Sequence, residues 1–148
     1  IRTGLGEELT LPNTMIVGTV TKNYSRTVKG NGYIVDTVLT IGYDTPWRQV
    51  HAMMIEAARR TEGILASPAP HVFQTALSDF YVEYRLVAQA VASAPRPRAQ
   101  VLTDLHTQLQ DVFNENGVQI MSPHYLGDPS QAKIVAPAQW NPPLTPAP

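Results

Sequence analysis

Apolar and polar positions along the chain follow two different periods, and the period changes from segment to segment. In four segments apolar residues fall at every second position or in short runs, which is typical of β-strands. In two longer segments they recur at every third or fourth position, which is typical of helices with one buried face. Strands are therefore predicted over residues 33–43, 71–77, 80–91 and 118–120, and helices over residues 46–61 and 98–116.

The apolar face of each element predicts which side chains form the core. Three such faces are expected to meet there, from the two helices and from the strand at residues 80–91. Their members are Trp47, Val50, Met54, Ala57 and Ala58; Val101, Leu105, Leu109, Val112 and Phe113; and Phe80, Val82, Tyr84 and Leu86. The alternate positions of the strand, Tyr81, Glu83 and Arg85, are expected on a solvated sheet face, where a neighbouring subunit or a cross-strand ion pair would meet them.

Residues with special backbone preferences mark the ends of the two helices. Asp44 or Thr45 is predicted to cap the first helix, with Pro46 at its first helical position. Gly63 and Gly117 are the predicted caps at the two carboxyl ends.

The order strand, helix, strand, strand, helix, strand predicts an α+β fold of the ferredoxin-like, split βαβ kind. In that arrangement two helices cover one face of a four-stranded sheet. The predicted domain spans residues 29–126 and follows a small partial β domain over residues 1–28. Residues 127–148 form a Pro-rich C-terminal tail.

The two ends of the chain differ from the middle. Near the start, an apolar strand is predicted at residues 11–16, and a second one is predicted to end at residues 23–26, with β-branched residues around Gly18 between them. The tail carries six prolines, so extended or polyproline conformations are expected instead of a helix. Only Ala132–Ala136 resembles a strand there.

Composition narrows the class of protein. The chain of 148 residues is 43% hydrophobic, enough for the core of one domain, but only 16% charged, a hint that partners cover part of its surface. A net charge of −1 gives no footprint for nucleic acid, and the absence of cysteine excludes disulfides and thiolate sites. Since it starts at Ile1 without a signal-like segment, the sequence is expected to be a processed or cut piece. No apolar run reaches the roughly 20 residues of a membrane span.

No residue pattern in the sequence predicts a catalytic, cofactor or metal site. The four histidines, His51, His71, His106 and His124, do not share a helix face at metal-ligand spacing, so structural or surface roles are expected. No Gly-x-Ser-x-Gly nucleophile elbow occurs, and the acidic residues are best explained as solvated surface.

Four short segments, taken together, resemble the small-conductance mechanosensitive channel family over about residues 1–126. They are the Leu11-Pro12-Asn13 step, Asn23-Tyr24-Ser25-Arg26, the Ile41-Gly42-Tyr43-Asp44-Thr45-Pro46 step into the first helix, and the closing Gly117-Val118-Gln119-Ile120-Met121-Ser122-Pro123. The closing step has one proline fewer than the commonest form in the family.

The resemblance implies a cytoplasmic vestibule and not an enzyme, with no cofactor. Seven subunits would form a ring beneath the membrane, attached through upstream segments, and ions and small solutes released on osmotic downshock would pass through it. The resemblance assigns a subunit-contact collar to Pro12, Asn13, Asn23, Tyr24, Ser25 and Arg26, and a possible terminal barrel strand to Lys133, Ile134 and Val135. It also implies that residues 1–28 pack less stably than the rest.

Two other hypotheses stay open on the residues alone. One is a soluble ferredoxin-like module that binds a regulatory ligand, which predicts a defined pocket. The other is a small enzyme on the same fold, which predicts a cluster of titratable residues in one cleft.

Overall fold

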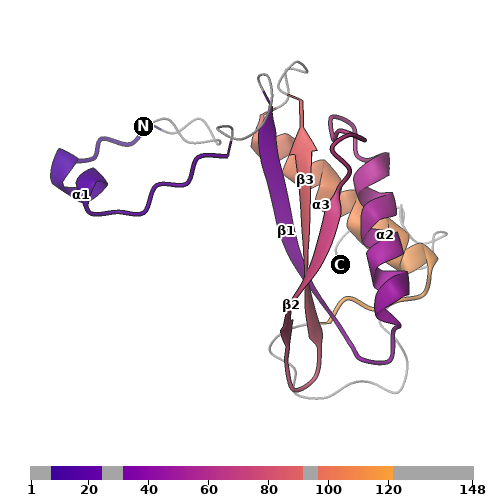
Figure 1. Cartoon of the computed structure of the whole chain (residues 1–148). Helices are drawn as coiled ribbons and strands as arrows, with labels where there is room; N and C mark the ends of the chain where they lie inside the picture. The colour runs from indigo at the N-terminus through magenta and orange to yellow at the C-terminus, as the bar shows by residue number, and fades with distance from the viewer. Residues whose placement is uncertain (1–7, 25–31, 92–96, 122–148) are drawn as a thin grey trace, which may run out of the picture.

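The computed structural model describes residues 8–24, 32–91 and 97–121, in which three helices and three strands are assigned (Figure 1). They are α1 (Asn13–Val17), β1 (Tyr33–Ile41), α2 (Trp47–Arg60), β2 (His71–Leu77), β3 (Val82–Ala90) and α3 (Arg98–Glu115). From β1 onward the order of the elements is the one that the sequence predicts, and the predicted α+β fold is confirmed.

The sheet is antiparallel, with β3 in the centre and strand order β1-β3-β2. The predicted fourth strand at residues 118–120 is reduced, in the described part of the chain, to a single bridge between Ile120 and Ile41 on the outer side of β1. Its position beside β1 is the one that a ferredoxin-like sheet requires.

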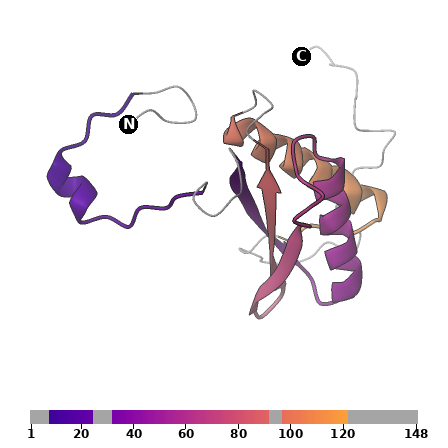
Figure 2. The ribbon, with the colours of Figure 1, turned by 45° about the horizontal axis from the view of Figure 1, so that its top comes forward.

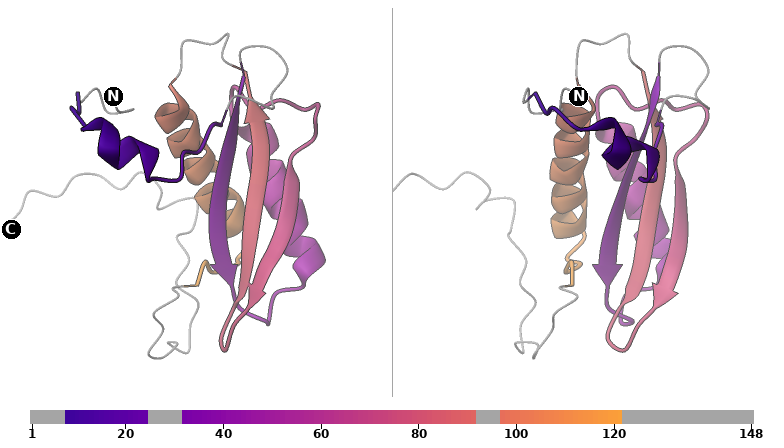
Figure 3. Two further views of the ribbon diagram at one scale, coloured as in Figure 1. Left: turned by 60° about the vertical axis from the view of Figure 1, so that its left-hand side comes forward. Right: turned by 90° about the vertical axis from the view of Figure 1, so that its left-hand side faces the viewer.

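Both helices pack on one face of the sheet, which Figure 3 shows from two sides. Alternate side chains of β1 and β3 turn toward the helices, so the core is a single layer between the sheet and the helix pair. All five predicted core residues of α3 are buried. An Arg60–Glu115 ion pair, with 2.9 Å between Nη1 and Oε2, joins α2 to α3 at the surface.

Two predicted core residues lie outside the core. Trp47 is 44% exposed, because it occupies the first turn of α2, where its ring contacts Arg48 and His51. Met53, which the pattern does not place in the core, is buried on the inner face of α2 beside Met54. Phe80 is 58% exposed because β3 begins only at Val82.

The ends of the helices agree with the prediction in part. Pro46 is the N-cap of α2, without a side-chain cap, so the predicted cap at Asp44 or Thr45 is wrong. At the end of α3, Gly117 has φ +67° as predicted, and the Val118 N–H donates to the Phe113 carbonyl over 2.9 Å. This is a Schellman motif, and it turns the chain so that Val118 is buried against the core.

Residues 8–24, hereafter the arm, extend away from the body of sheet and helices (Figures 1 and 2). The predicted apolar strand at residues 11–16 is wrong, because the chain forms the short helix α1 there, with Pro12 as its N-cap. Pro12 has extended angles and pre-sets the chain for a helix start, so β-branched residues do not force a strand when no neighbouring strand pairs with them. No residue of α1 is buried.

Candidate functional site: the arm, its junction and a groove

The arm presents more apolar surface than an isolated domain needs. Large apolar side chains along it are exposed to solvent, up to 87% at Val17 and 86% at Val20. The others are Leu9, Leu11, Met15 and Ile16. Exposed apolar side chains gathered in one short segment indicate that the segment packs against another surface.

Four of the predicted collar residues lie in the arm. Pro12 and Asn13 stand at the start of α1, whereas Asn23 and Tyr24 lie at the far end, next to the body. Ser25 and Arg26 lie outside the described residues, as does the predicted barrel strand at Lys133, Ile134 and Val135. The four collar residues that the structure describes therefore lie in two separate parts of the arm.

The arm joins the body at Tyr24. The Ile34 N–H, on the outer edge of β1, donates to the Tyr24 carbonyl over 2.8 Å. The guanidinium of Arg98 lies 4.2 Å from the centre of the Tyr24 ring, a cation–π contact. Tyr24 is thus held from β1 and from the start of α3 at once.

Arg98 also fixes the start of α3 to β1. Its Nε donates to the Ile34 carbonyl over 3.0 Å, and its Nη2 donates to Asp36 Oδ1 over 3.1 Å. Arg85, across the sheet on β3, approaches the other Asp36 oxygen at 3.9 Å. We call Tyr24, Ile34, Asp36 and Arg98 the junction.

Arg98 and Asp36 are not among the site residues that the sequence predicts. Arg98 is the first residue of α3, where a cation opposes the helix dipole, and Asp36 is a charged residue in a strand whose other residues are apolar, aromatic or threonine. Each residue departs from the pattern of its element, and the two departures compensate each other. A charged residue at a position that its element disfavours is the sequence signal by which both residues could have been found.

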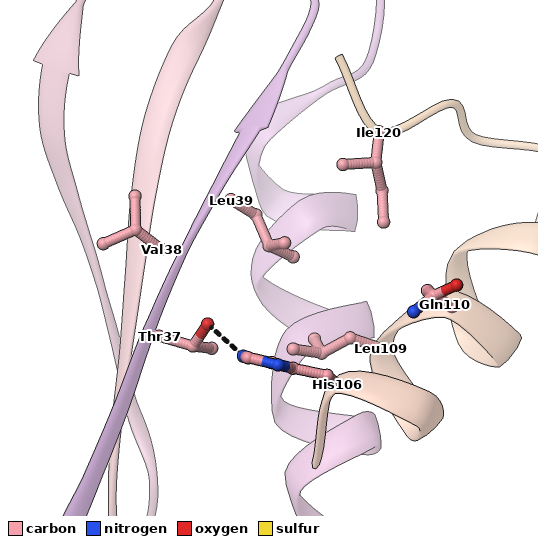
Figure 4. Close-up of a pocket in the computed structure, with 7 residues that line it drawn as sticks. All are labelled: Thr37, Val38, Leu39, His106, Leu109, Gln110 and Ile120. Carbon is pink, nitrogen blue, oxygen red and sulfur yellow. Dashed lines mark hydrogen bonds between the residues drawn. The ribbon is translucent and has the colours of Figure 1, made fainter. Parts of the chain in front are cut away.

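A shallow groove of about 450 Å³ lies between β1 and α3 (Figure 4). Thr37 and Leu39 point into it from β1, and His106, Leu109 and Gln110 approach from α3. The hydroxyl oxygen of Thr37 lies 2.8 Å from His106 Nε2, so the one histidine of the groove is engaged with the protein itself.

The groove marks the stretch of the β1 edge that the described chain leaves unpaired. The arm pairs with one end of that edge at Ile34, and the Met121 N–H donates to the Thr40 carbonyl over 2.8 Å at the other end. Between these two points, no backbone hydrogen bond from the described residues reaches the outer side of β1. An open edge of this kind accepts a further strand.

The histidines have structural positions where the structure describes them. His51 lies between the rings of Trp47 and Tyr84, with centroid distances of 5.2 and 5.7 Å. Burial lowers the pKa of His51, and its buried Nε2 has no hydrogen-bond partner among the described residues. Burial likewise raises the pKa of Tyr84.

Residues 8–24, 32–91 and 97–121 contain neither a cluster of metal ligands nor a helix that could span a membrane. His124 lies beyond this part of the chain, and no group of three or more His, Asp or Glu side chains within it is placed to hold a metal ion. None of the helices in it has the length and apolar character to cross a bilayer.

Comparison with known proteins gives one family match and several matches in fold. Residues 35–120 match the family model "Mechanosensitive ion channel MscS, C-terminal". The fold resembles a crystal structure of Helicobacter pylori MscS in the closed state, with a TM-score of 0.58, 15% identity, and coverage of 85% of this chain and 48% of that one. It also resembles a cryo-EM structure of wild-type AtMSL1, with a TM-score of 0.54, 15% identity, and coverage of 76% and 39%. No curated protein sequence matches the chain.

Proposed function

The chain belongs to the MscS family of mechanosensitive ion channels and contains the C-terminal domain of that family, and we propose that it forms the cytoplasmic vestibule of a tension-gated channel. That family is one of ion channels and not a class of enzymes. The chain spans 39% and 48% of the two channel chains that it resembles. In the proposal, ions and small solutes pass through the vestibule when membrane tension opens a pore on osmotic downshock.

The exposed apolar arm is the observation that carries the proposal. Residues 8–23 are exposed throughout, although they include six large apolar side chains. At about 25 cal/mol per Å² of apolar surface, covering them is worth several kcal/mol, which the chain gains only from contact with another surface. A ring of identical subunits supplies that surface to every arm at once.

Within this proposal, the arm belongs to a β collar and the body forms the wall of the vestibule. Seven copies make the ring, with Pro12, Asn13 and residues 23–26 near the contacts between subunits. The junction then connects collar and wall within each subunit. The strand-like segment Lys133-Ile134-Val135 closes the far end of the ring as a small barrel.

The coding sequence upstream of Ile1 gives a first test. Three apolar segments of about 20 residues, the last one rich in glycine and alanine, are expected there. An upstream sequence that encodes no such segment would contradict the proposal that the chain is part of a channel.

Pressure-clamp recording gives the second test. The complete gene product, reconstituted in giant liposomes, is expected to pass current only above a threshold of suction. Liposomes without protein provide the baseline, and protein that stays closed up to the lytic tension of the bilayer would contradict the proposal.

A further inference from the structure

A second exposed apolar surface lies at the opposite end of β1 from the arm. Its members are large side chains of the loop before α2, the first turn of α2 and the hairpin between β2 and β3. They are Tyr43, Trp47, Leu77 and Phe80, with exposed fractions of 55%, 44%, 73% and 58%, and we call them the end cluster.

Contacts between the elements place these residues at one end of the body. The Tyr43 hydroxyl donates to the Ser78 carbonyl in the hairpin over 2.7 Å. Leu77 and Ile41 both pair with Val82, so the tip of the hairpin and the end of β1 are level with each other. In Figure 1 the hairpin, the start of α2 and the end of β1 all lie at the bottom of the view.

The described chain ends at this same end of the body. Met121 donates to Thr40, and the Thr40 hydroxyl donates back to the Met121 carbonyl. A Cβ at Gly42, the residue before Tyr43, would lie 3.8 Å from Met121 Cγ. Met121, the last described residue, therefore lies beside Gly42, one residue before Tyr43 of the end cluster. An extended chain covers about 3 Å per residue, so residues 122–136 are long enough to bring residue 137 from Met121 to the end cluster.

We propose that the segment at residues 137–148 of the same chain docks on the end cluster. Five of its residues are proline, at positions 137, 142, 143, 146 and 148, and none is charged. Polyproline segments bind aromatic surfaces, because their conformation is preformed and little entropy is lost on docking. The proline rings and Leu144 cover the rings of Tyr43, Trp47 and Phe80.

The chemistry of residues 137–148 fits the end cluster better than it fits the arm. Sheet pairing requires amide donors, which the prolines lack, whereas an aromatic surface requires none. The inference concerns how the chain folds on itself, and it holds whether or not the chain is part of a channel.

Trp47 reports on the docking once Trp140 is removed. In the Trp140→Phe chain, the emission of Trp47 is expected to be shielded from acrylamide. Replacement of Pro142, Pro143, Pro146 and Pro148 by serine keeps the length of the segment and is expected to abolish the shielding. The matched control, Pro129→Ser, changes a proline outside the segment and is expected to leave the shielding intact.

Hydrogen exchange tests the surface from the other side. Leu77→Ser and Phe80→Ser are expected to speed exchange of the amides of Leu144 and Thr145. Phe73→Ser, at a 54% exposed position of β2 outside the end cluster, is expected to leave them protected. Circular dichroism is used to check that each variant is folded. Two separate cluster variants are made so that the test still stands if one of them fails to fold.

Three outcomes would overturn the proposal. One is that the quenching of Trp47 is unchanged by the serine substitutions. Another is that the segment exchanges at the rate of a free peptide in the unaltered chain. The third is that the shielding disappears on dilution, which would make the occupant a segment of a second copy.

Discussion

Two residues of the body, His51 and Arg98, occupy positions that the hydrophobic pattern of their helices does not explain. Each leads to a prediction. His51 is a polar ring in an aromatic environment between Trp47 and Tyr84. Arg98 is a cation at the start of a helix, stabilised there by the Ile34 carbonyl and by Asp36. Neither arrangement follows from hydrophobic periodicity, because that pattern does not record what a polar side chain contacts in three dimensions.

His51 is expected to make the stability of the body depend on pH. Burial lowers the pKa of His51 in the folded chain below the ordinary 6.5. Below pH 6.5, His51 therefore binds a proton more readily in the unfolded chain than in the folded one. The contribution of His51 to stability is therefore complete above pH 6.5 and declines as the pH falls toward the folded pKa.

Urea unfolding at pH 7.5 and pH 5.5 measures this decline. His51→Phe removes the titration and also the buried unpaired nitrogen, so a smaller loss between the two pH values is expected of the variant. An equal loss in wild type and variant would assign the pH dependence to other groups.

Arg98→Gln is expected to loosen the junction. The variant loses the charged hydrogen bond to Asp36 and the contact with Tyr24, at a cost of about 1 kcal/mol in the free energy of unfolding. Exchange of the Ile34 amide with solvent should become faster, because its acceptor is the Tyr24 carbonyl. Arg59→Gln is the matched control, since that arginine is 71% exposed and lies 3.6 Å from Glu56. Unchanged exchange at Ile34 in the Arg98 variant would mean that Arg98 does not hold the arm.

Among the elements, the turn after α3 determines where the chain meets β1. Gly117, at φ +67°, directs Val118 into the core and places Ile120 and Met121 beside β1. Alanine at this position is strained, so Gly117→Ala is expected to lower the free energy of unfolding by about 1 kcal/mol. Gly18→Ala is the control, because Gly18 has φ −90° and an added Cβ there would meet only the Thr14 carbonyl oxygen at 3.8 Å. Equal effects of the two substitutions on thermal unfolding would contradict this role of Gly117.

The elements β1, α2, β3 and α3 could be predicted from the sequence because each buries an apolar face. The α3 stripe from Val101 to Phe113 is one example, and Gly117 marked its end correctly. The prediction failed where burial does not determine the conformation. Ile16 and Val17 favour a strand by propensity, yet they form a helix, because in the arm neither is buried or paired with a strand. Periodicity predicts Trp47 and Phe80 in the core although both are exposed, because it does not show that Trp47 begins α2 or that Phe80 precedes β3.

In the whole molecule, the arm and the body are expected to differ in local stability. The Ile34 N–H, which donates to the Tyr24 carbonyl, joins the arm to the body, whereas β3 pairs with β1 along its full length and with β2 from Val82 to Val87. Amides of residues 9–23 should exchange with solvent far faster than those of β3, measured on the chain alone. Equal protection in both regions would show that the arm packs in a way that its exposure does not suggest.

The arm variant Val17→Asp with Val20→Asp separates assembly from folding. Both side chains are almost fully exposed in the single chain, so the double variant should leave the free energy of unfolding of the body unchanged. If the arms pack against neighbouring subunits, each carboxylate must be buried there, and desolvation disfavours the ring by several kcal/mol per contact. Light scattering of the complete gene product in detergent is then expected to show the loss of the sevenfold mass.

Phe73→Asp, a change of the same kind at a position of β2 that is 54% exposed and lies outside the end cluster, provides the control and should keep the ring intact. Loss of the ring in the arm variant alone would place the subunit contacts on the arm, because the control also puts a carboxylate at an exposed apolar position of the chain. A ring that survives the arm variant would mean that the collar is built from other residues, and the apolar arm would then require a different partner.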